Sequence, residues 1–177
     1  MSTYAEFLAG KKLIVQSSGI DIPVSDLHES MFGFQKDLTR WALRKGRSAI
    51  FATTGMGKTI MQLEWSRQIV KQTGHSVLIL APLAVARQTV GEGQRWGIEV
   101  TQARNQSEAA IGGITVGNYE MLHAFDPSAF GAVVLDESGI LKNFEGKGRT
   151  GLIRAFRDTP YRLCATATPA PNDIAEL

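Results

Sequence analysis

A glycine-rich segment at residues 52–59, Ala-Thr-Thr-Gly-Met-Gly-Lys-Thr, combines residue types that bind phosphate. It lies between a short apolar run and a stretch that is compatible with a helix. Glycines leave room for backbone N–H groups to turn inward around an anion, and Lys58 supplies positive charge for the outer phosphates. The hydroxyl of Thr59 is suited to Mg²⁺ at the start of the helix. The candidate nucleotide-binding residues of this loop are therefore Thr54, Gly55, Met56, Gly57, Lys58 and Thr59.

Two acidic residues, Asp136 and Glu137, follow a second apolar run at 132–135. Phosphoryl transfer needs positioning and charge neutralisation more than covalent chemistry. One acid is therefore expected to hold hydrated Mg²⁺, and the other to orient and deprotonate an attacking water. We assign the first role to Asp136, together with Thr59, and the second to Glu137. The alternatives are an ordinary glycine-rich turn and a pair of acids at a helix N-terminus, but the presence of both segments in one chain favours a nucleotide site.

The bulk composition predicts one α/β domain, because 177 residues that are 44% hydrophobic can bury one good core. The net charge of +2 is compatible with a nucleic-acid partner but does not require one. The single cysteine, Cys164, excludes an internal disulfide and is expected to be a buried residue of a strand. Because no stretch approaches the roughly 18 apolar residues of a membrane span, we expect a cytoplasmic protein without a membrane partner.

Short apolar runs alternate with segments of helical periodicity along most of the chain. The predicted strands are 48–52, 76–81, 98–101, 114–117, 132–136 and 161–166, and the predicted helices are 35–45, 59–71 and 85–96. Uninterrupted apolar strands that alternate with helices are typical of a mostly parallel sheet with helices on both faces. Ligands collect at the carboxyl ends of such strands, which is where both candidate segments lie.

The two ends of the chain differ from this pattern. Residues 1–30 mix apolar and turn-forming residues and are expected to be an extension that packs on a main domain at 31–177. Near the other end, Asn172 or Asp173 would cap a helix for which only residues 174–177 remain. We therefore expect that the sequence is cut before a further domain.

Six segments occur in a fixed order: Phe34-Gln35, 52–59, Ala81-Pro82-Leu83, 115–120 (TVGNYE), 136–138 and 165–173 (ATATPAPND). In this order they resemble the Q motif and motifs I, Ia, Ib, II and III of the first RecA-like motor domain of superfamily 2 helicases and translocases. The likeness is strongest to the Swi/Snf-like and the phage or restriction-type branch, and it covers about residues 32–177. The resemblance implies a RecA-like P-loop NTPase fold.

The resemblance also implies roles for single residues, with ATP and Mg²⁺ as cofactors. Gln35 would read the adenine edge, since its amide can donate and accept at once. Lys58, Asp136 and Glu137 would catalyse hydrolysis. Thr166 and Thr168 would couple the nucleotide state to a DNA-binding surface, the alternative being an ordinary strand exit.

Two positions depart from the family pattern. Gly139 stands at the fourth position of motif II, so a side-chain link from there toward motif III cannot exist, and coupling is expected to take another route. Thr53 stands where many Swi/Snf-like relatives carry an acid. By contrast, the pair Lys142-Asn143 matches the Swi/Snf-like pattern.

DNA is the expected macromolecular partner. Arg87, Asn118 and Lys142 lie in or beside motifs Ia, Ib and II and are the candidate contacts. Residues 140–162 carry six basic and two acidic side chains, which fits either a surface that follows phosphates or a solvated helix face. Because no aromatic residues are interleaved with them in a pattern suited to base stacking and sequence reading, the contacts are expected to be to the backbone and largely independent of sequence.

The predicted function is the ATP-binding half of an ATP-dependent DNA helicase or translocase. The resemblance implies a second RecA-like domain that supplies an arginine finger, so the chain alone is expected to hydrolyse ATP weakly or not at all. The likeness to the phage branch is compatible with a phage-encoded protein that acts inside a bacterial host. The alternatives are a nucleotide-dependent DNA-binding module without motor activity and a P-loop nucleotide kinase.

Overall fold

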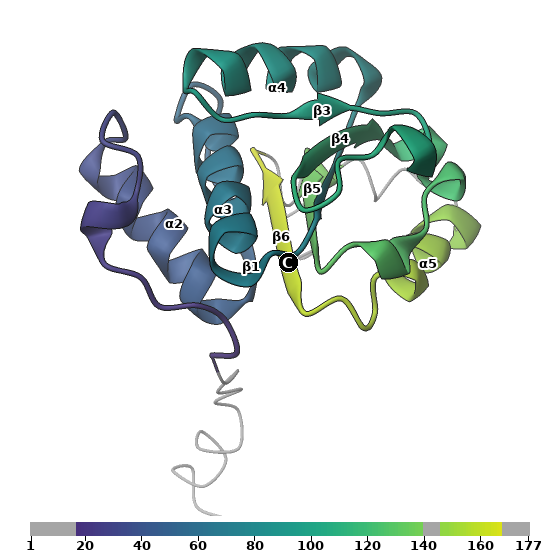
Figure 1. Ribbon diagram of the computed structural model, residues 1–177, viewed down its shortest axis with the longest axis horizontal. Helices are drawn as coiled ribbons and strands as arrows, with labels where there is room; N and C mark the ends of the chain where they lie inside the picture. Colours follow the sequence, from purple (N-terminus) through teal and green to yellow (C-terminus); the bar gives the residue numbers. More distant parts are fainter. Residues whose placement is uncertain (1–16, 140–145, 168–177) are drawn as a thin grey trace, which may run out of the picture.

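The computed structural model describes residues 17–139 and 146–167 (Figure 1). Several sequence-based expectations fall outside these residues: the role of Lys142, the coupling role of Thr168, and the helix start at 172–173. Among the described residues, no helix is both long and apolar enough to cross a membrane.

A six-stranded sheet forms the centre of the described structure, with the strand order β1-β6-β5-β2-β4-β3 and parallel pairing throughout. The strands are β1 (Arg47–Phe51), β2 (Val77–Ala81), β3 (Thr101–Gln102), β4 (Ile114–Asn118), β5 (Ala132–Asp136) and β6 (Tyr161–Thr166). Every residue of β2 and β5 is buried, as expected for apolar strands that are covered on both faces. The predicted α/β fold with a parallel sheet is therefore confirmed.

The third strand is shorter and later than predicted. Ile98 is buried, but its backbone N–H donates to the carbonyl of Gly93 at 2.8 Å and not to a neighbouring strand. This bond folds the chain back against the end of the preceding helix. The apolar run at 98–101 is therefore mainly a packing contact, and pairing with β4 begins only at Thr101.

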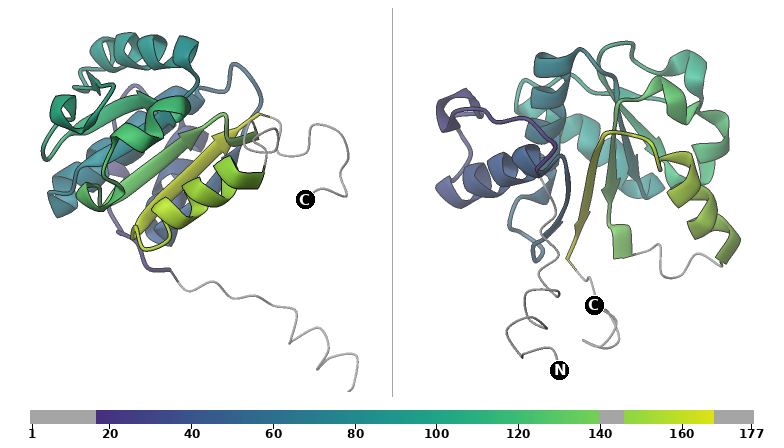
Figure 2. Two further views of the ribbon diagram at one scale, coloured as in Figure 1. Left: turned by 90° about the vertical axis from the view of Figure 1, so that its right-hand side faces the viewer. Right: turned by 90° about the horizontal axis from the view of Figure 1, so that it is seen from below.

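Within residues 17–139 and 146–167, four α-helices cover the sheet: α2 (Gly33–Lys45), α3 (Lys58–Thr73), α4 (Leu83–Arg95) and α5 (Gly146–Ala155). Gly46 and Gly74 end α2 and α3 with positive φ angles, which glycine adopts readily. The helix α5 was not predicted, because its sequence GKGRTGLIRA is interrupted by glycines, which disfavour a helix. It lies on the opposite side of the sheet from α2 and α3 (Figure 2), where Leu152 and Phe156 join an apolar cluster.

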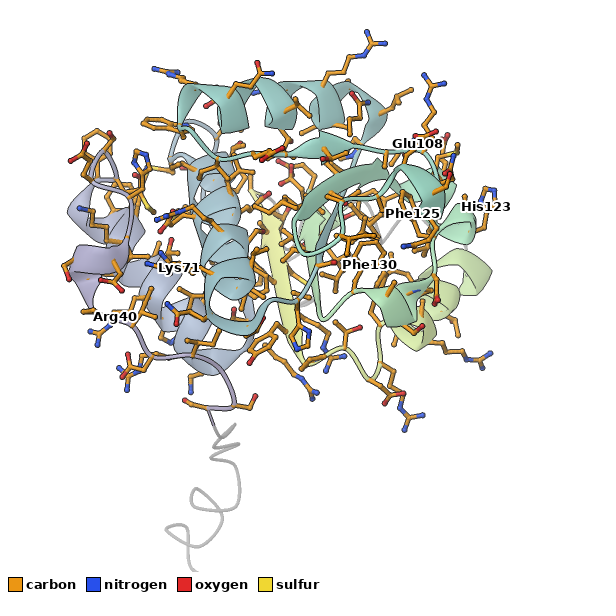
Figure 3. All side chains as sticks on the ribbon, in the orientation of Figure 1. Arg40, Lys71, Glu108, His123, Phe125 and Phe130 are labelled. Atoms are coloured by element: carbon orange, nitrogen blue, oxygen red, sulfur yellow. The ribbon has the colours of Figure 1, made fainter. Side chains whose placement is uncertain are left out.

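Short 3-10 turns complete the fold: η1 (Val24–Asp26), η2 (Gln106–Glu108), η3 (Tyr119–Ala124) and η4 (Pro127–Ala129). The ring of Phe125, directly after η3, meets that of Phe130 edge to face with centroids 6.2 Å apart (Figure 3). Both rings belong to the same apolar cluster as α5. The segment that contains η3 and η4 therefore builds part of the face of the sheet that α2 and α3 leave uncovered.

Residues 17–32 lie against α2 and α3. The buried carboxylate of Glu64, on α3, accepts hydrogen bonds from the backbone N–H of His28 at 3.2 Å and from the guanidinium of Arg67 at 2.8 Å. Arg67 and Gln68 both donate to the carbonyl oxygen of Asp26. A buried charge is tolerated only when it is paired and hydrogen-bonded, so this network fixes residues 26–28 on α3.

Candidate nucleotide-binding site

The loop between β1 and α3 has the backbone of an anion-binding turn. Gly55 and Gly57 adopt φ angles of 83° and 75°, in the left-handed region that favours glycine. A Cβ on Gly57 would lie 2.3 Å from Nε2 of Gln35, whereas one on Gly55 would meet nothing within 4 Å. Gly57 is also the N-cap of α3, so the loop leads straight into a helix N-terminus.

Lys58 lies between the end of β1 and the acidic pair. Its ammonium group donates to the carbonyl oxygen of Ala52 at 3.1 Å and lies 3.8 Å from Oε1 of Glu137. The Lys58 side chain is only 10% exposed, compared with 39% for Glu137. Lys58 and Asp136 are 78 positions apart in the sequence. The structure nevertheless brings the glycine-rich loop and the acidic pair into contact.

Asp136 ends β5 as a nearly buried carboxylate. Its Oδ1 accepts a 2.6 Å hydrogen bond from Nε2 of Gln62, one turn into α3. Burial raises the pKa of Asp136, and the bond from Gln62 offsets part of that rise. Mg²⁺ is commonly held by one or two carboxylates together with phosphate oxygens. The carboxylate of Asp136 and the hydroxyl of Thr59, which line one cleft, fit that donor set.

Glu137 has an unusual backbone. Its φ of 48° makes it the one non-glycine residue with a positive φ in the part of the chain that the structure describes. For an L-residue this conformation costs about 1–2 kcal/mol, and such outliers gather at functional sites. The carboxylate lies 3.4 Å from the hydroxyl of Thr166, at the end of β6. The structure therefore brings a predicted coupling residue beside the predicted base.

These residues open into one cleft of about 720 Å³, which we call the central cleft. Seven of the residues assigned to nucleotide or metal binding line it: Gln35, Thr54, Gly55, Gly57, Lys58, Thr59 and Asp136. Glu137 lines it as well. The opposite wall comes from the N-terminal segment and α4: Ser30, Phe32, Val85, Gln88, Glu92, Arg95 and Trp96. The α4 wall was missed by the sequence analysis, although the spacing of 85, 88, 92 and 95 along a predicted helix was a signal for it.

Gln35 lines the central cleft and also links Phe32 to Met56 through hydrogen bonds. Its Oε1 accepts the backbone N–H of Phe32 at 3.0 Å, and its Nε2 donates to the carbonyl oxygen of Met56 at 3.1 Å. Met56 itself is not among the lining residues. Each polar atom of the amide has capacity for one more hydrogen bond, so contact with a base edge remains available.

A second hollow, of about 340 Å³, lies at the carboxyl ends of β2, β3 and β4, and we call it the β4 groove. It is lined by Leu83, Ala86, Arg87, Gln102, Ala103, Arg104, Gly117, Asn118, Glu120 and Met121. The structure thus brings the predicted residues Arg87 and Asn118 together. The side chain of Asn118 also accepts the backbone N–H of Glu120 at 3.1 Å, which caps η3. Arg104 was missed, because it follows the short β3 and belongs to no motif.

One basic residue of the 140–162 stretch has a structural role. The guanidinium of Arg162 donates to the carbonyl oxygens of Phe156 and Arg157, at the end of α5. Burial lowers the pKa of Arg162, as does the neighbouring charge of Arg47. Arg154 and Arg157 are exposed. Arg162 therefore holds the end of α5 in place, while the surface of α5 carries the exposed charges.

Comparisons with known proteins agree with this geometry at the level of the fold. No protein-family model and no curated protein sequence matches the chain. Among solved structures, the SWI2/SNF2 ATPase core of Sulfolobus solfataricus in complex with dsDNA matches 88% of this chain with 18% identity and a TM-score of 0.68. The UvsW helicase from bacteriophage T4 matches 97% with 17% identity and a TM-score of 0.66. The Hef helicase domain of Pyrococcus furiosus matches 81% with 15% identity and a TM-score of 0.64.

The chain has an α/β RecA-like fold, similar to that of the helicase and ATPase domains just named. The order of motifs in the sequence predicted this fold, and the structural matches confirm it. The chain spans 36%, 61% and 33% of the length of these three solved chains, respectively. In this RecA-like domain, the central cleft contains the loop lysine and the acidic pair, and the β4 groove lies beside it at the same edge of the sheet.

Proposed function

We propose that this RecA-like domain binds and hydrolyses magnesium-ATP as one half of an ATP-dependent DNA translocase or helicase. The proposal rests on one observation: Lys58 lies beside Glu137 in the central cleft, which Thr59 and Asp136 also line. A phosphate-binding loop, a metal ligand and a base are the parts that phosphoryl transfer to water requires. An ordinary glycine-rich turn would not bring them together.

The roles follow from position and chemistry. The loop N–H groups and Lys58 bind the outer phosphates, and Asp136 with Thr59 holds Mg²⁺, which neutralises phosphate charge when bound. Glu137 is half-exposed in the cleft and is placed to accept a proton from water. The left-handed backbone of Glu137 directs this carboxylate toward Lys58 and Thr166.

The β4 groove is the proposed DNA contact, through Arg87 and Asn118 and through contacts to the phosphate backbone. Support comes from the groove itself and from the likeness to an ATPase core that was solved with dsDNA. We further propose that a second RecA-like domain completes the motor and supplies an arginine finger, with residues 1–30 as an extension of this first domain. The proposed site of action is the cytoplasm.

Phosphate release from the 177-residue chain, compared with that from Glu137→Gln, tests the proposal. We expect slow hydrolysis by the wild type, because an arginine finger contributes about 10³- to 10⁵-fold in related phosphoryl transfers. Hydrolysis by Glu137→Gln should be slower still, while both proteins bind ATP equally well. Equal rates in the two proteins would support a nucleotide-dependent binding module without motor chemistry and would overturn the proposal.

A further inference from the structure

Residues 118–120 lie between the β4 groove and the central cleft. Asn118 and Glu120 line the groove. Tyr119, between them, is only 6% exposed and packs in the apolar cluster under the sheet. Its hydroxyl donates a 2.8 Å hydrogen bond to the carbonyl oxygen of Asp136. One short stretch of chain therefore lines the β4 groove and contacts Asp136, a residue that lines the central cleft.

The carbonyl oxygen of Asp136 belongs to the peptide group that joins Asp136 to Glu137. Rotation of this peptide group changes the φ angle of Glu137, which is 48°. A left-handed residue that is not glycine persists only where its surroundings hold it. The hydroxyl of Tyr119 is one such restraint, because it fixes the direction in which this peptide points.

The Tyr119 hydroxyl is a dependable donor. It is buried, and burial, followed by the nearby charge of Asp136, raises the pKa of Tyr119 above its ordinary value. The links from residues 136–138 to β6 are longer: 3.4 Å from Ser138 to the carbonyl of Ala165, and 3.4 Å from Thr166 to Glu137. The 2.6 Å bond from Gln62 holds the side chain of Asp136 and not its peptide group. Gly139 offers no side chain for such a link.

Aromatic rings also pack against the segment that contains Tyr119. A Cβ on Gly117, the second-last residue of β4, would lie 3.0 Å from the ring of Phe125. Phe125 is packed in turn against Phe130, as Figure 3 shows. Packing through Phe125 therefore joins the end of β4 to the residue that follows η3.

We propose that Tyr119 is a positioning residue that couples occupancy of the β4 groove by a nucleic-acid backbone to the orientation of Glu137. This inference rests on the proposed function of the two hollows. It supplies a route between them that does not need a side chain at position 139.

The test is Tyr119→Phe, which removes the hydroxyl and leaves the ring in its cluster. Tyr161→Phe, at the start of β6, is the matched control. Single-turnover hydrolysis of labelled ATP, with and without a short mixed-sequence duplex, gives the rate, and calorimetry gives the affinity. We expect Tyr119→Phe to lower the rate about tenfold, which corresponds to the loss of one hydrogen bond. It should also lose the stimulation by DNA while its affinity for magnesium-ATP is unchanged.

Unchanged rate and DNA stimulation in Tyr119→Phe would overturn the inference while leaving the proposed function intact. Failure of the wild type to bind magnesium-ATP would instead overturn the proposed function. A second measurement does not depend on the variant. Hydrogen exchange of wild-type backbone amides at 132–139 should slow when the duplex binds, and exchange that is the same with and without DNA would contradict the coupling.

Discussion

Replacing Gly57 with alanine should disturb the loop more than the same change at Gly55. At both positions an L-residue would have to adopt a positive φ, 75° at Gly57 and 83° at Gly55. Only at Gly57 would the new Cβ also strike a neighbour, 2.3 Å from Nε2 of Gln35. Gly55→Ala is therefore a control that carries the backbone strain without the clash.

The size of the difference follows from these contacts. The left-handed conformation lowers the free energy of unfolding by about 1–2 kcal/mol in either variant. In Gly57→Ala, Gln35 must also give up its hydrogen bond to the carbonyl of Met56, which is worth about 0.5–1.5 kcal/mol. We expect losses of about 1–2 kcal/mol for Gly55→Ala and about 2–3 kcal/mol for Gly57→Ala.

Urea unfolding of the two variants measures these losses directly. Combining each change with Gln35→Ala adds a second check, because without the Gln35 amide the clash is removed and the two glycine variants should become equally stable. Equal losses for Gly55→Ala and Gly57→Ala in the wild-type background would refute the reasoning. Such a result would mean that the Gln35 amide does not restrain the loop at 52–59.

Three further outcomes are expected. Burial raises the pKa of Asp136 in the folded state, so ionisation of this carboxyl group lowers the free energy of unfolding as the pH rises toward that pKa. Asp136→Asn should therefore raise the melting temperature at neutral pH. The gain should fade below pH 3.8, the ordinary pKa of the group. Thermal unfolding across pH checks this. Arg87→Ala should weaken DNA binding equally on different sequences and reduce the salt slope by about one unit, as measured by anisotropy. Glu64→Gln should lower the free energy of unfolding by about 1–3 kcal/mol in urea, because Arg67 loses a charged partner; an unchanged midpoint would contradict the role given to this network.

The parts of the fold that the sequence predicts best are those with a strong local signal. β5 and β6 have the predicted bounds, because β5 is an apolar run that ends at Asp136, and β6 is apolar apart from Arg162 and Thr166. The loop at 52–59 was recognised because glycines, a lysine and a threonine have a fixed spacing there. By contrast, the strand at 98–101 was misplaced, because a single backbone bond to Gly93 diverted Ile98 from pairing.

The features that sequence analysis missed depend on contacts between distant segments. The left-handed backbone of Glu137 carries no local signal, since nothing in Leu-Asp-Glu-Ser favours it over an ordinary strand exit. The bond from Tyr119 to Asp136 joins the start of η3 to the end of β5, 17 positions along the chain. Whether the Tyr119 hydroxyl can reach the carbonyl of Asp136 depends on the sheet order, in which β2 lies between β4 and β5.

The central claim is that the loop at 52–59 and the acidic pair hold magnesium-ATP in the central cleft. Calorimetric titration of magnesium-ATP into the wild type, Lys58→Ala and the control Lys71→Ala tests it most directly. Lys71 is an exposed residue near the far end of the same helix, α3 (Figure 3). We predict saturable binding to the wild type and to Lys71→Ala, and much weaker binding to Lys58→Ala, because the phosphate-facing charge is lost. Equal affinity in all three folded proteins would contradict the claim.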